Sequence, residues 1–388
     1  MHEYRQLFAL PGAVRLATFS GLSRVGNGWF LAALSLGPVV RGSALTEAAL
    51  IGALWAAVHA VAAPVQARLL RRRSLRKLSY RLSAAFALAA CALCAAVAWA
   101  PVLCWLVPAA LTAAFSPAVS SSTREMWWRM TDHEPLRRTA SGWEAAATPA
   151  AYAIAPALGL LSATTLPLWL AIAAGAGLCV VGVAGLCGLP HAAAELQAAT
   201  DRAGGVRELR PLLAVYACYH ASRAALDLGM VALAVSGGYA ALGGVLVGLP
   251  SAAAAFAGLW VGARSSRWPA LGRMITLSLL AQAAAISLIL LTQAWWWLLL
   301  AGVLAGTVKS ATPPAVHHLS ASLMHGRAAE AAAWVGVAIV AGGAAGRLIA
   351  APAGDAAGPL ILILAACGWL VLGAVLSVRL HRSDSVRA

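Results

Sequence analysis

A set of ionisable side chains lies inside long apolar stretches of the sequence. A charged side chain at the centre of a bilayer costs at least about 2.5–3.5 kcal/mol, so such residues are expected to face protein or water rather than lipid. The set consists of Arg24, His59, Glu144, His220, Arg223, Asp227, Lys309, Glu330 and Arg347. Groups of both signs in this setting could bind an ionic ligand, carry a proton or pair with one another.

Arg223 and Asp227 are four residues apart, so on a helix they share a face and can pair. Two interpretations stay open: a neutralised structural pair, or an Asp227 that exchanges a proton while Arg223 or a ligand alternates as its partner. Glu144 has no neighbour in its own stretch and could carry a proton or serve as a structural acceptor. Arg24 could bind an anionic group or pair with Glu144 or Asp227, and the sequence does not choose.

The sequence also suggests roles for the remaining intramembrane cations and histidines. Lys309 could act as a ligand group or extend toward the nearer membrane surface. Arg347 is expected near the end of its apolar stretch, reaching toward the surface and Asp355. His59 and His220 are more often hydrogen-bonded core residues than proton relays, and both roles are retained here.

The composition requires a membrane to hold these residues. The chain has 388 residues, 61% of them hydrophobic and 11% charged, and a mean hydropathy of +0.80. A soluble domain is about half apolar and about a quarter charged, so a soluble globule and a sizeable extramembrane domain are excluded. The apolar runs do not alternate as porin strands do. We therefore predict an all-α, multi-pass membrane protein.

Apolar windows bounded by charge, Pro and Gly predict twelve spans of about 20 residues. They cover 14–40, 44–67, 82–100, 101–122, 138–162, 166–189, 210–235, 239–263, 274–293, 295–316, 328–350 and 357–378. The longest polar stretch, 191–209, is a predicted central loop between six-helix domains at 1–190 and 210–380, with a tail at 381–388. Spans three, six, nine and twelve have no ionisable residue in their interiors and are expected at the lipid-facing periphery.

Basic residues segregate between alternate loops. Of the 28 Lys and Arg residues, 23 fall in one set of loops plus the termini, and the opposite set holds only Arg41. By the positive-inside rule, both termini and the central loop are cytoplasmic. The net charge of +15 therefore reflects orientation and does not indicate nucleic-acid binding. The excess of Arg, Ala and Gly suggests a GC-rich bacterial genome, hence the bacterial cytoplasmic membrane.

The two halves share an internal repeat. Ser23-Arg24 matches Ser222-Arg223 at an offset of 199 residues, and Ser116-Pro117-Ala118 matches Pro313-Pro314-Ala315 at 197. Parallel repeats of six helices are typical of secondary transporters, which bind their substrate between the halves near the bilayer midplane.

The loop after span two carries a basic motif. Arg72 and Arg76 match basic positions of the pattern G-x-x-x-D-R-x-G-R-R, Arg68 and Lys77 extend it, and Arg71 replaces its acid. With the twelve spans, this loop resembles the major facilitator superfamily (MFS) over essentially the whole chain. The resemblance implies two pseudo-symmetric six-helix bundles and a gating role for the loop.

In span five, Pro156 and Gly159 match the G-P-x-x-G-G motif of that family's proton-coupled exporters, while Ala155 and Leu160 depart from it. The resemblance implies proton-coupled efflux of a small molecule by a monomer in the lipid bilayer. Two alternatives stay open: a metabolite importer of the same fold, and a sensor or scaffold that has lost transport.

No enzyme motif is complete. His133-Glu134 begins like a zinc-protease helix but lacks the second His, and no ATP-binding segment is present. We expect no catalytic residue, metal or cofactor. The seven cysteines are expected to pack in the spans, and the cluster from Met126 to Arg129 to be an aromatic anchor at the membrane surface.

Overall fold

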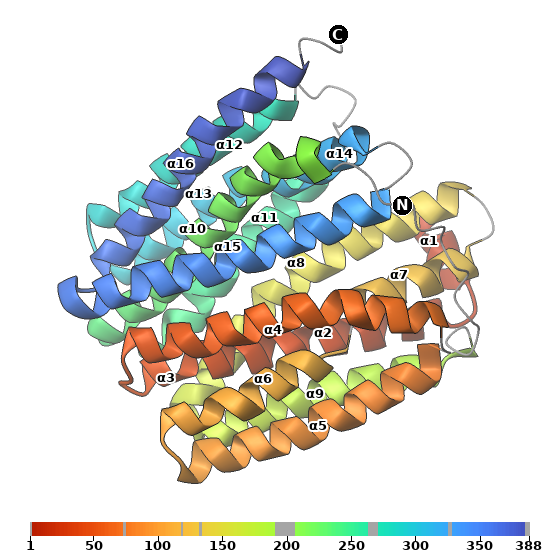
Figure 1. Ribbon diagram of the computed structural model, residues 1–388, viewed down its shortest axis with the longest axis horizontal. Coiled ribbons are helices and arrows are strands. Elements are labelled where there is room, and N and C mark those ends of the chain that lie inside the picture. The colour runs from red at the N-terminus through yellow and green to blue at the C-terminus, as the bar shows by residue number, and fades with distance from the viewer. Residues whose placement is uncertain are drawn as a thin grey trace.

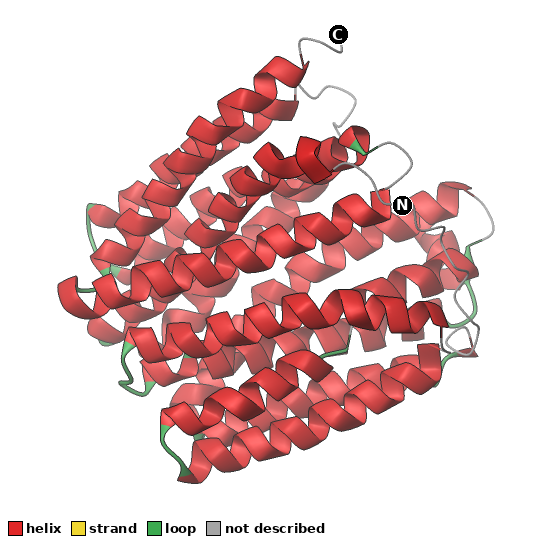
Figure 2. Ribbon diagram, in the orientation of Figure 1, coloured by secondary structure: helices red, strands yellow, loops and turns green. Residues whose placement is uncertain are grey.

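The computed structural model describes residues 2–72, 75–117, 119–131, 134–190, 206–262, 271–324 and 328–384, and all regular elements in these ranges are helical (Figures 1 and 2). The first half contains α1 His2–Ala9, α2 Ala13–Ser35, α3 Gly37–Val40, α4 Leu45–Arg72, α5 Leu75–Trp99, η1 Val102–Trp105, α6 Leu106–Phe115, α7 Val119–Met130, α8 Glu134–Thr165 and α9 Leu168–Cys187. The second half contains η3 Val206–Leu209, α10 Arg210–Ser236, η4 Ala240–Leu242, α11 Gly243–Gly262, α12 Leu271–Ser287, η6 Leu288–Leu290, α13 Trp295–Lys309, α14 Thr312–Leu323, α15 Ala328–Ala357 and α16 Leu360–Asp384.

Each predicted span corresponds to a helix or to a broken pair of helices. Several boundaries differ from the prediction: α5 begins at Leu75 rather than at 82, and α7 and α14 end at Met130 and Leu323 rather than at 122 and 316. Residues 381–384 of the predicted tail continue α16, and α15 runs to Ala357 rather than to 350. The predicted central loop is described only at 206–209, which form η3; its residues 191–205 and the tail residues 385–388 lie outside the described part of the chain.

Within the described ranges, seven helical segments are long and apolar enough to cross a membrane: Leu45–Ala63, Arg76–Trp99, Leu168–Cys187, Ala240–Ala257, Leu271–Leu290, Trp334–Ala357 and Leu360–Val378. The other predicted spans are the first, fourth, fifth, seventh and tenth. The fourth and tenth are broken, and the others hold the charged residues Arg24, Glu144, Arg223 and Asp227. Three of these spans thus carry candidate site residues.

The fourth and tenth spans break at matching places. The first break lies between α6 and α7 at Ser116 and Pro117, and the second between α13 and α14, just before two prolines. Proline has no N–H to donate, so a helix loses backbone bonds there. Polar side chains of neighbouring helices bond to the carbonyl oxygens at each break: Gln66 donates to Ala114 O at 2.9 Å, and Ser278 donates to Val308 O at 2.9 Å.

The helices form two groups, α1–α9 and α10–α16. Figure 1 shows α5 and α9 along one edge of the molecule and α12 and α16 along the other, with α2, α4, α8, α10, α11 and α15 between them. The edge helices belong to spans three, six, nine and twelve, as the absence of charge in their interiors predicts. Helix α1 and the last turn of α16 lie at the same end of the molecule, called here the terminal end; the opposite end is called the far end.

Small residues bring two of the inner helices very close to their neighbours. A methyl group built on Gly182 of α9 would lie 2.8 Å from Ser23 Cα of α2, and one built on Gly346 of α15 would lie 2.6 Å from Ala221 Cα of α10. Glycine permits such close helix packing in membranes. These contacts fix the backbone beside Arg24 and Arg223.

The two groups meet near the far end, through α4 with α15 and through α8 with α11. Leu45, Ala48 and Leu160 join the hydrophobic cluster of the second group. Along the same face of α4, Gly52 is buried, whereas His59, about two turns nearer the terminal end, is partly exposed. The contacts between the groups that are named here therefore lie at the far end.

A carboxylate reinforces the closure at the far end. Asp355 of α15 accepts hydrogen bonds from the backbone N–H groups of Leu45 at 2.7 Å and Thr46 at 2.9 Å, and from the Thr46 hydroxyl at 2.5 Å. These N–H groups belong to the first turn of α4, which lacks helical acceptors. One helix group thus caps a helix of the other.

Candidate functional site

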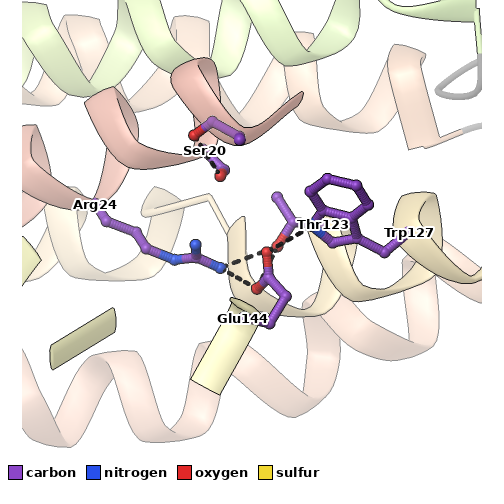
Figure 3. A network of polar contacts seen from close by, with 6 residues as sticks. Ser20, Arg24, Thr123, Trp127 and Glu144 are labelled. Carbon is purple, nitrogen blue, oxygen red and sulfur yellow. Dashed lines mark hydrogen bonds and ion pairs between the residues drawn. The ribbon is translucent and has the colours of Figure 1, made fainter. Parts of the chain in front are cut away.

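A buried ion pair joins α2 to α8. Nη2 of Arg24 forms an ion pair with Oε2 of Glu144 and donates to Thr123 Oγ1 at 3.0 Å. Thr123 in turn donates to Glu144 Oε2 at 3.1 Å, and Trp127 Nε1 donates to Glu144 Oε1 at 2.9 Å (Figure 3). Both carboxylate oxygens are therefore bonded, and Arg24 pairs with Glu144 rather than with Asp227.

The network lies away from the surface, with Arg24 8% and Glu144 4% exposed. Trp127 is also buried and packs in the cluster that contains Leu16 and Met130. The prediction that this tryptophan is a surface anchor is therefore wrong. Its indole N–H points inward to a carboxylate, a partner that spacing along the chain cannot reveal.

Only some of the hydrogen-bond donors of the Arg24 guanidinium have an acceptor among the described residues. Its Nε and Nη1 atoms are buried and, within the described ranges, have no hydrogen-bond partner. A guanidinium offers five N–H donors, and buried donors are normally bonded. The side chain therefore retains donor capacity beyond its pair with Glu144.

A second charged pair lies on α10. Arg223 Nε is 3.7 Å from Asp227 Oδ2, one turn away, and Arg223 Nη2 donates to Ser251 of α11 at 2.9 Å. The side chains of Arg223 and Asp227 are 25% and 20% exposed. This pair is longer and more open than the one in the first group.

Two further cationic side chains lie near this pair. Lys309, in the last turn of α13, is 6% exposed, interacts electrostatically with Arg223 and Asp227, and has no ion-pair partner within the described chain. Arg347 also interacts electrostatically with Arg223 and Asp227, and its Nε is buried without a hydrogen bond to any described residue.

Arg347 does not reach toward Asp355 as expected. Its side chain packs against Gly52 of α4, where an added methyl group would lie 3.3 Å from Arg347 Cδ. Asp355 instead caps α4. The reason is length: α15 continues ten residues beyond Arg347, which places this side chain inside the span at the junction of the two groups.

The two predicted histidines occupy aromatic surroundings. His59 stacks on Trp55, with ring centroids 4.8 Å apart, and its Nδ1 is 3.4 Å from Ala113 O. His220 presents its ring edge-on to Tyr216 and Tyr219, at 4.7 Å and 5.0 Å. Its Nε2 is buried with no partner in the described part of the molecule. His220 interacts electrostatically with Arg223 and Lys309 and so adjoins the second charged cluster.

Tyr152 of α8 links the two halves of the site. It is 39% exposed and interacts electrostatically with Arg24, Arg223 and Arg347. Sequence reasoning missed this residue, as it missed Thr123. The only available signal was weak: Tyr152 lies eight residues after Glu144, near the same face of one helix.

The predicted gating loop is described in part. Arg68 and Arg72 fall near the end of α4, where their side chains lie outside the described ones, as do the loop residues 73–74. Arg76 and Lys77 are exposed in the first turn of α5.

The two helix-five motif residues make close contacts between helices. A methyl group built on Gly159 would lie 2.8 Å from Trp29 O of α2. Pro156 and Ala157 lie against Gly244 of α11, where an added methyl group would be 2.6 Å from Ala157 Cα. The motif therefore lies where α8 packs against α2 of the first helix group and against α11 of the second.

No protein-family model matches the sequence, and neither does any curated protein. Solved structures do match. A peptide transporter, POT, in complex with sulfate is similar with a TM-score of 0.75 and 14% identity, over 96% of this chain and 95% of that one. The nucleoside transporter NupG gives 0.69 and 13%, over 94% and 97%. A bacterial homologue of the iron transporter ferroportin, in its inward-facing state, gives 0.68 and 13%, over 94% and 97%.

These likenesses extend over nearly the whole chain, and at this identity they establish the fold. They confirm the predicted class, an all-α multi-pass membrane protein. The fold is similar to that of these transporters, as expected from the resemblance to the major facilitator superfamily.

Proposed function

We propose that this protein is a secondary active transporter that moves a small molecule across the membrane by alternating access, with protons as the coupling ion and net efflux. One observation carries the proposal: side chains from both helix groups gather around charged residues beside the closure at the far end. Tyr152 of the first group lies there within electrostatic range of Arg223 and Arg347 of the second. Similar folds in NupG and POT belong to proteins named as nucleoside and peptide transporters.

The charge segregation supports an orientation. If the Arg-rich terminal end is cytoplasmic, the closed far end is extracellular, and the structure corresponds to an inward-facing state of a bacterial cytoplasmic-membrane protein. In this orientation the motif of Arg68, Arg72, Arg76 and Lys77 lies at the cytoplasmic ends of α4 and α5, where a gating loop would act.

Two carboxylates are the candidate proton carriers. Protonation of Glu144 would cancel its charge and release Arg24, whose remaining donors could then bind another group. Protonation of Asp227 would release Arg223 in the same way. Either event would change the charge of the site and so couple proton binding to the conformational equilibrium.

Support for efflux comes from Pro156 and Gly159, which resemble an exporter motif and pack at the contact of α8 with α2 and α11. The second candidate is an importer of the same fold, in which proton and substrate move together. The third is a sensor or scaffold without transport.

A transport assay separates these candidates. A thermal-shift screen of purified protein against metabolites and drugs identifies a ligand, because a ligand of the native state raises its stability. Reconstituted vesicles are then given that ligand and a pH gradient. An acidic interior drives uptake if protons and substrate exchange, whereas an acidic exterior drives uptake if they move together. Absence of any flux would favour the scaffold.

Carboxylate variants test the coupling. Glu144→Gln and Asp227→Asn are compared with Glu208→Gln, which changes an exposed carboxylate in η3 outside the spans. We expect at least one of the first two to abolish gradient-driven uptake and the third to leave it unchanged. Unaltered gradient-driven uptake in both span variants would show that neither carboxylate alone is required for proton coupling.

A further inference from the structure

The charges inside the helix groups do not balance. Among the described side chains away from the ends of the spans, four cations face two carboxylates: Arg24, Arg223, Lys309 and Arg347 against Glu144 and Asp227. Arg24 and Glu144 form a pair of their own. The excess of positive charge therefore lies in the second group, where Arg223, Lys309 and Arg347 share Asp227.

Packing brings these cations to one place. Gly306 of α13 lies directly against Pro250 of α11, where an added methyl group would be 2.7 Å from Pro250 Cα. Lys309 follows Gly306 by three residues and so lies near the same face of α13. Ser251, next to Pro250, accepts the hydrogen bond from Arg223. Lys309 and Arg223 therefore converge around one turn of α11.

Part of the cluster is accessible. Arg223 and Asp227 are partly exposed, and so is Tyr152, which approaches from the other helix group. Arg347 packs against Gly52, at the closure of the two groups. A ligand among these residues would touch both groups just inside the far-end contact.

The cluster contains a buried donor without a bond: Arg347 Nε has no acceptor in the described ranges. Arg24 Nε and Nη1, in the other helix group, are also buried donors with no acceptor there. Lys309 adds a buried ammonium group that interacts electrostatically with Arg223 and Asp227. Buried donors normally have partners, and guanidinium groups match the two oxygens of carboxylate and phosphate groups. A cation would be repelled, and a neutral ligand would leave the excess charge uncompensated.

We infer that the transported substrate is a small soluble anion, bound through carboxylate or phosphate oxygens by Arg223, Lys309 and Arg347, with Tyr152 closing the site from the other helix group. This inference rests on the proposed transport function and supplies its substrate class.

Binding is measured on the purified full-length protein in detergent, at constant ionic strength, by the shift of its melting temperature. The probes are inorganic phosphate, succinate and benzoate as anions, tetraethylammonium as a cation, glucose as a neutral solute, and dihexanoyl phosphatidic acid as a lipid-borne phosphate. We expect at least one of the three soluble anions to stabilise the protein and the cation and glucose to have no effect. Stabilisation by the cation or by glucose without any anion effect, or by the phosphatidic acid alone, would overturn the assignment.

Variants locate the site. Lys309→Gln and Arg347→Gln each remove one charged donor, and loss of one such contact should weaken anion binding by about 10- to 100-fold. Lys309→Arg keeps the charge and should retain most of the affinity. Arg273→Gln removes an exposed charge from α12 and should leave binding unchanged. Elution volume and melting temperature without ligand confirm that each variant is folded, and anion binding equal to wild type in both Gln variants would contradict the site.

The two proposals can fail separately. If anions bind in a way that depends on Lys309 but reconstituted vesicles show no flux, the anion site stands and the transport proposal fails. If a cationic or neutral compound is transported and no anion binds, the transport proposal stands and the anion site fails.

Discussion

Trp127 and Trp143 offer a matched pair at the scale of single residues. Both are in or against the same hydrophobic cluster and both pack edge-on against Phe8, with ring centroids 6.4 Å and 5.1 Å away. The Trp127 indole donates to Glu144, whereas the buried Trp143 Nε1 has no partner among the described side chains. The two residues therefore differ in one hydrogen bond to a carboxylate and in burial, since Trp127 is 2% exposed and Trp143 is partly exposed.

Replacing Trp127 by Phe should destabilise the protein more than replacing Trp143 by Phe. The first change keeps a ring but removes a bond to a charged group, which is worth about 1.5–3 kcal/mol; the second removes a donor that bonds to nothing described. Thermal unfolding in detergent measures the difference. Equal losses of stability would show that the bond to Glu144 contributes nothing beyond ring packing.

At the scale of elements, the contact of α15 with α10 depends on the absence of a side chain. Gly346→Ala would place a methyl group 2.6 Å from Ala221 Cα, so α15 would have to move away. Overpacking of this kind typically costs about 1–3 kcal/mol. We expect a lower melting temperature for Gly346→Ala and little change for Gly336→Ala, where the same helix has open space. A normal melting temperature for both would contradict the close approach.

The cap between Asp355 and α4 predicts how the far end opens. Asp355→Ala removes an acceptor of three hydrogen bonds between the helix groups, so the closed state should become less populated. Loss of even 1.4 kcal/mol is a tenfold change in such an equilibrium. The readout is the maleimide labelling rate of Ala48→Cys, a buried position of the closure, in a background without native cysteines.

The control for this labelling experiment is Glu47→Ala, which removes an exposed carboxylate from the same turn of α4. We expect faster labelling with Asp355→Ala and an unchanged rate with Glu47→Ala. If both variants label at the parental rate, the cap does not hold the far end closed.

At the scale of the whole molecule, the orientation can be tested directly. Ala44 is exposed between α3 and α4 at the far end, and Glu208 is exposed in η3, just before α10, on the terminal side. In intact cells without native cysteines, a membrane-impermeant maleimide should label Ala44→Cys at once, and Glu208→Cys only after permeabilisation. The reverse pattern would invert the proposed direction of transport.

Much of the molecule could be predicted because apolar length alone specifies a membrane helix, and the twelve windows correspond to the observed helices. Which charged side chains pair with each other could not be predicted. Arg24 and Glu144 are 120 residues apart, and only packing decides that they meet. Trp127 was misplaced because a tryptophan beside an arginine near a helix end fits a surface anchor equally well. Arg347 was misplaced because the end of α15 was set seven residues too early, since Pro352 and Asp355 resemble a terminus but lie inside the helix.

The breaks in spans four and ten affect how each group can deform. Bending an intact helix sacrifices backbone bonds, but at these two points the prolines have already removed donors, and Gln66 and Ser278 hold the carbonyl oxygens from outside. The helices on the terminal side of the breaks, α7 and α14, can therefore rotate relative to α6 and α13 when only a few side-chain hydrogen bonds are exchanged. Because Thr123 and Trp127 lie on α7, such a rotation would pull directly on the carboxylate of Glu144.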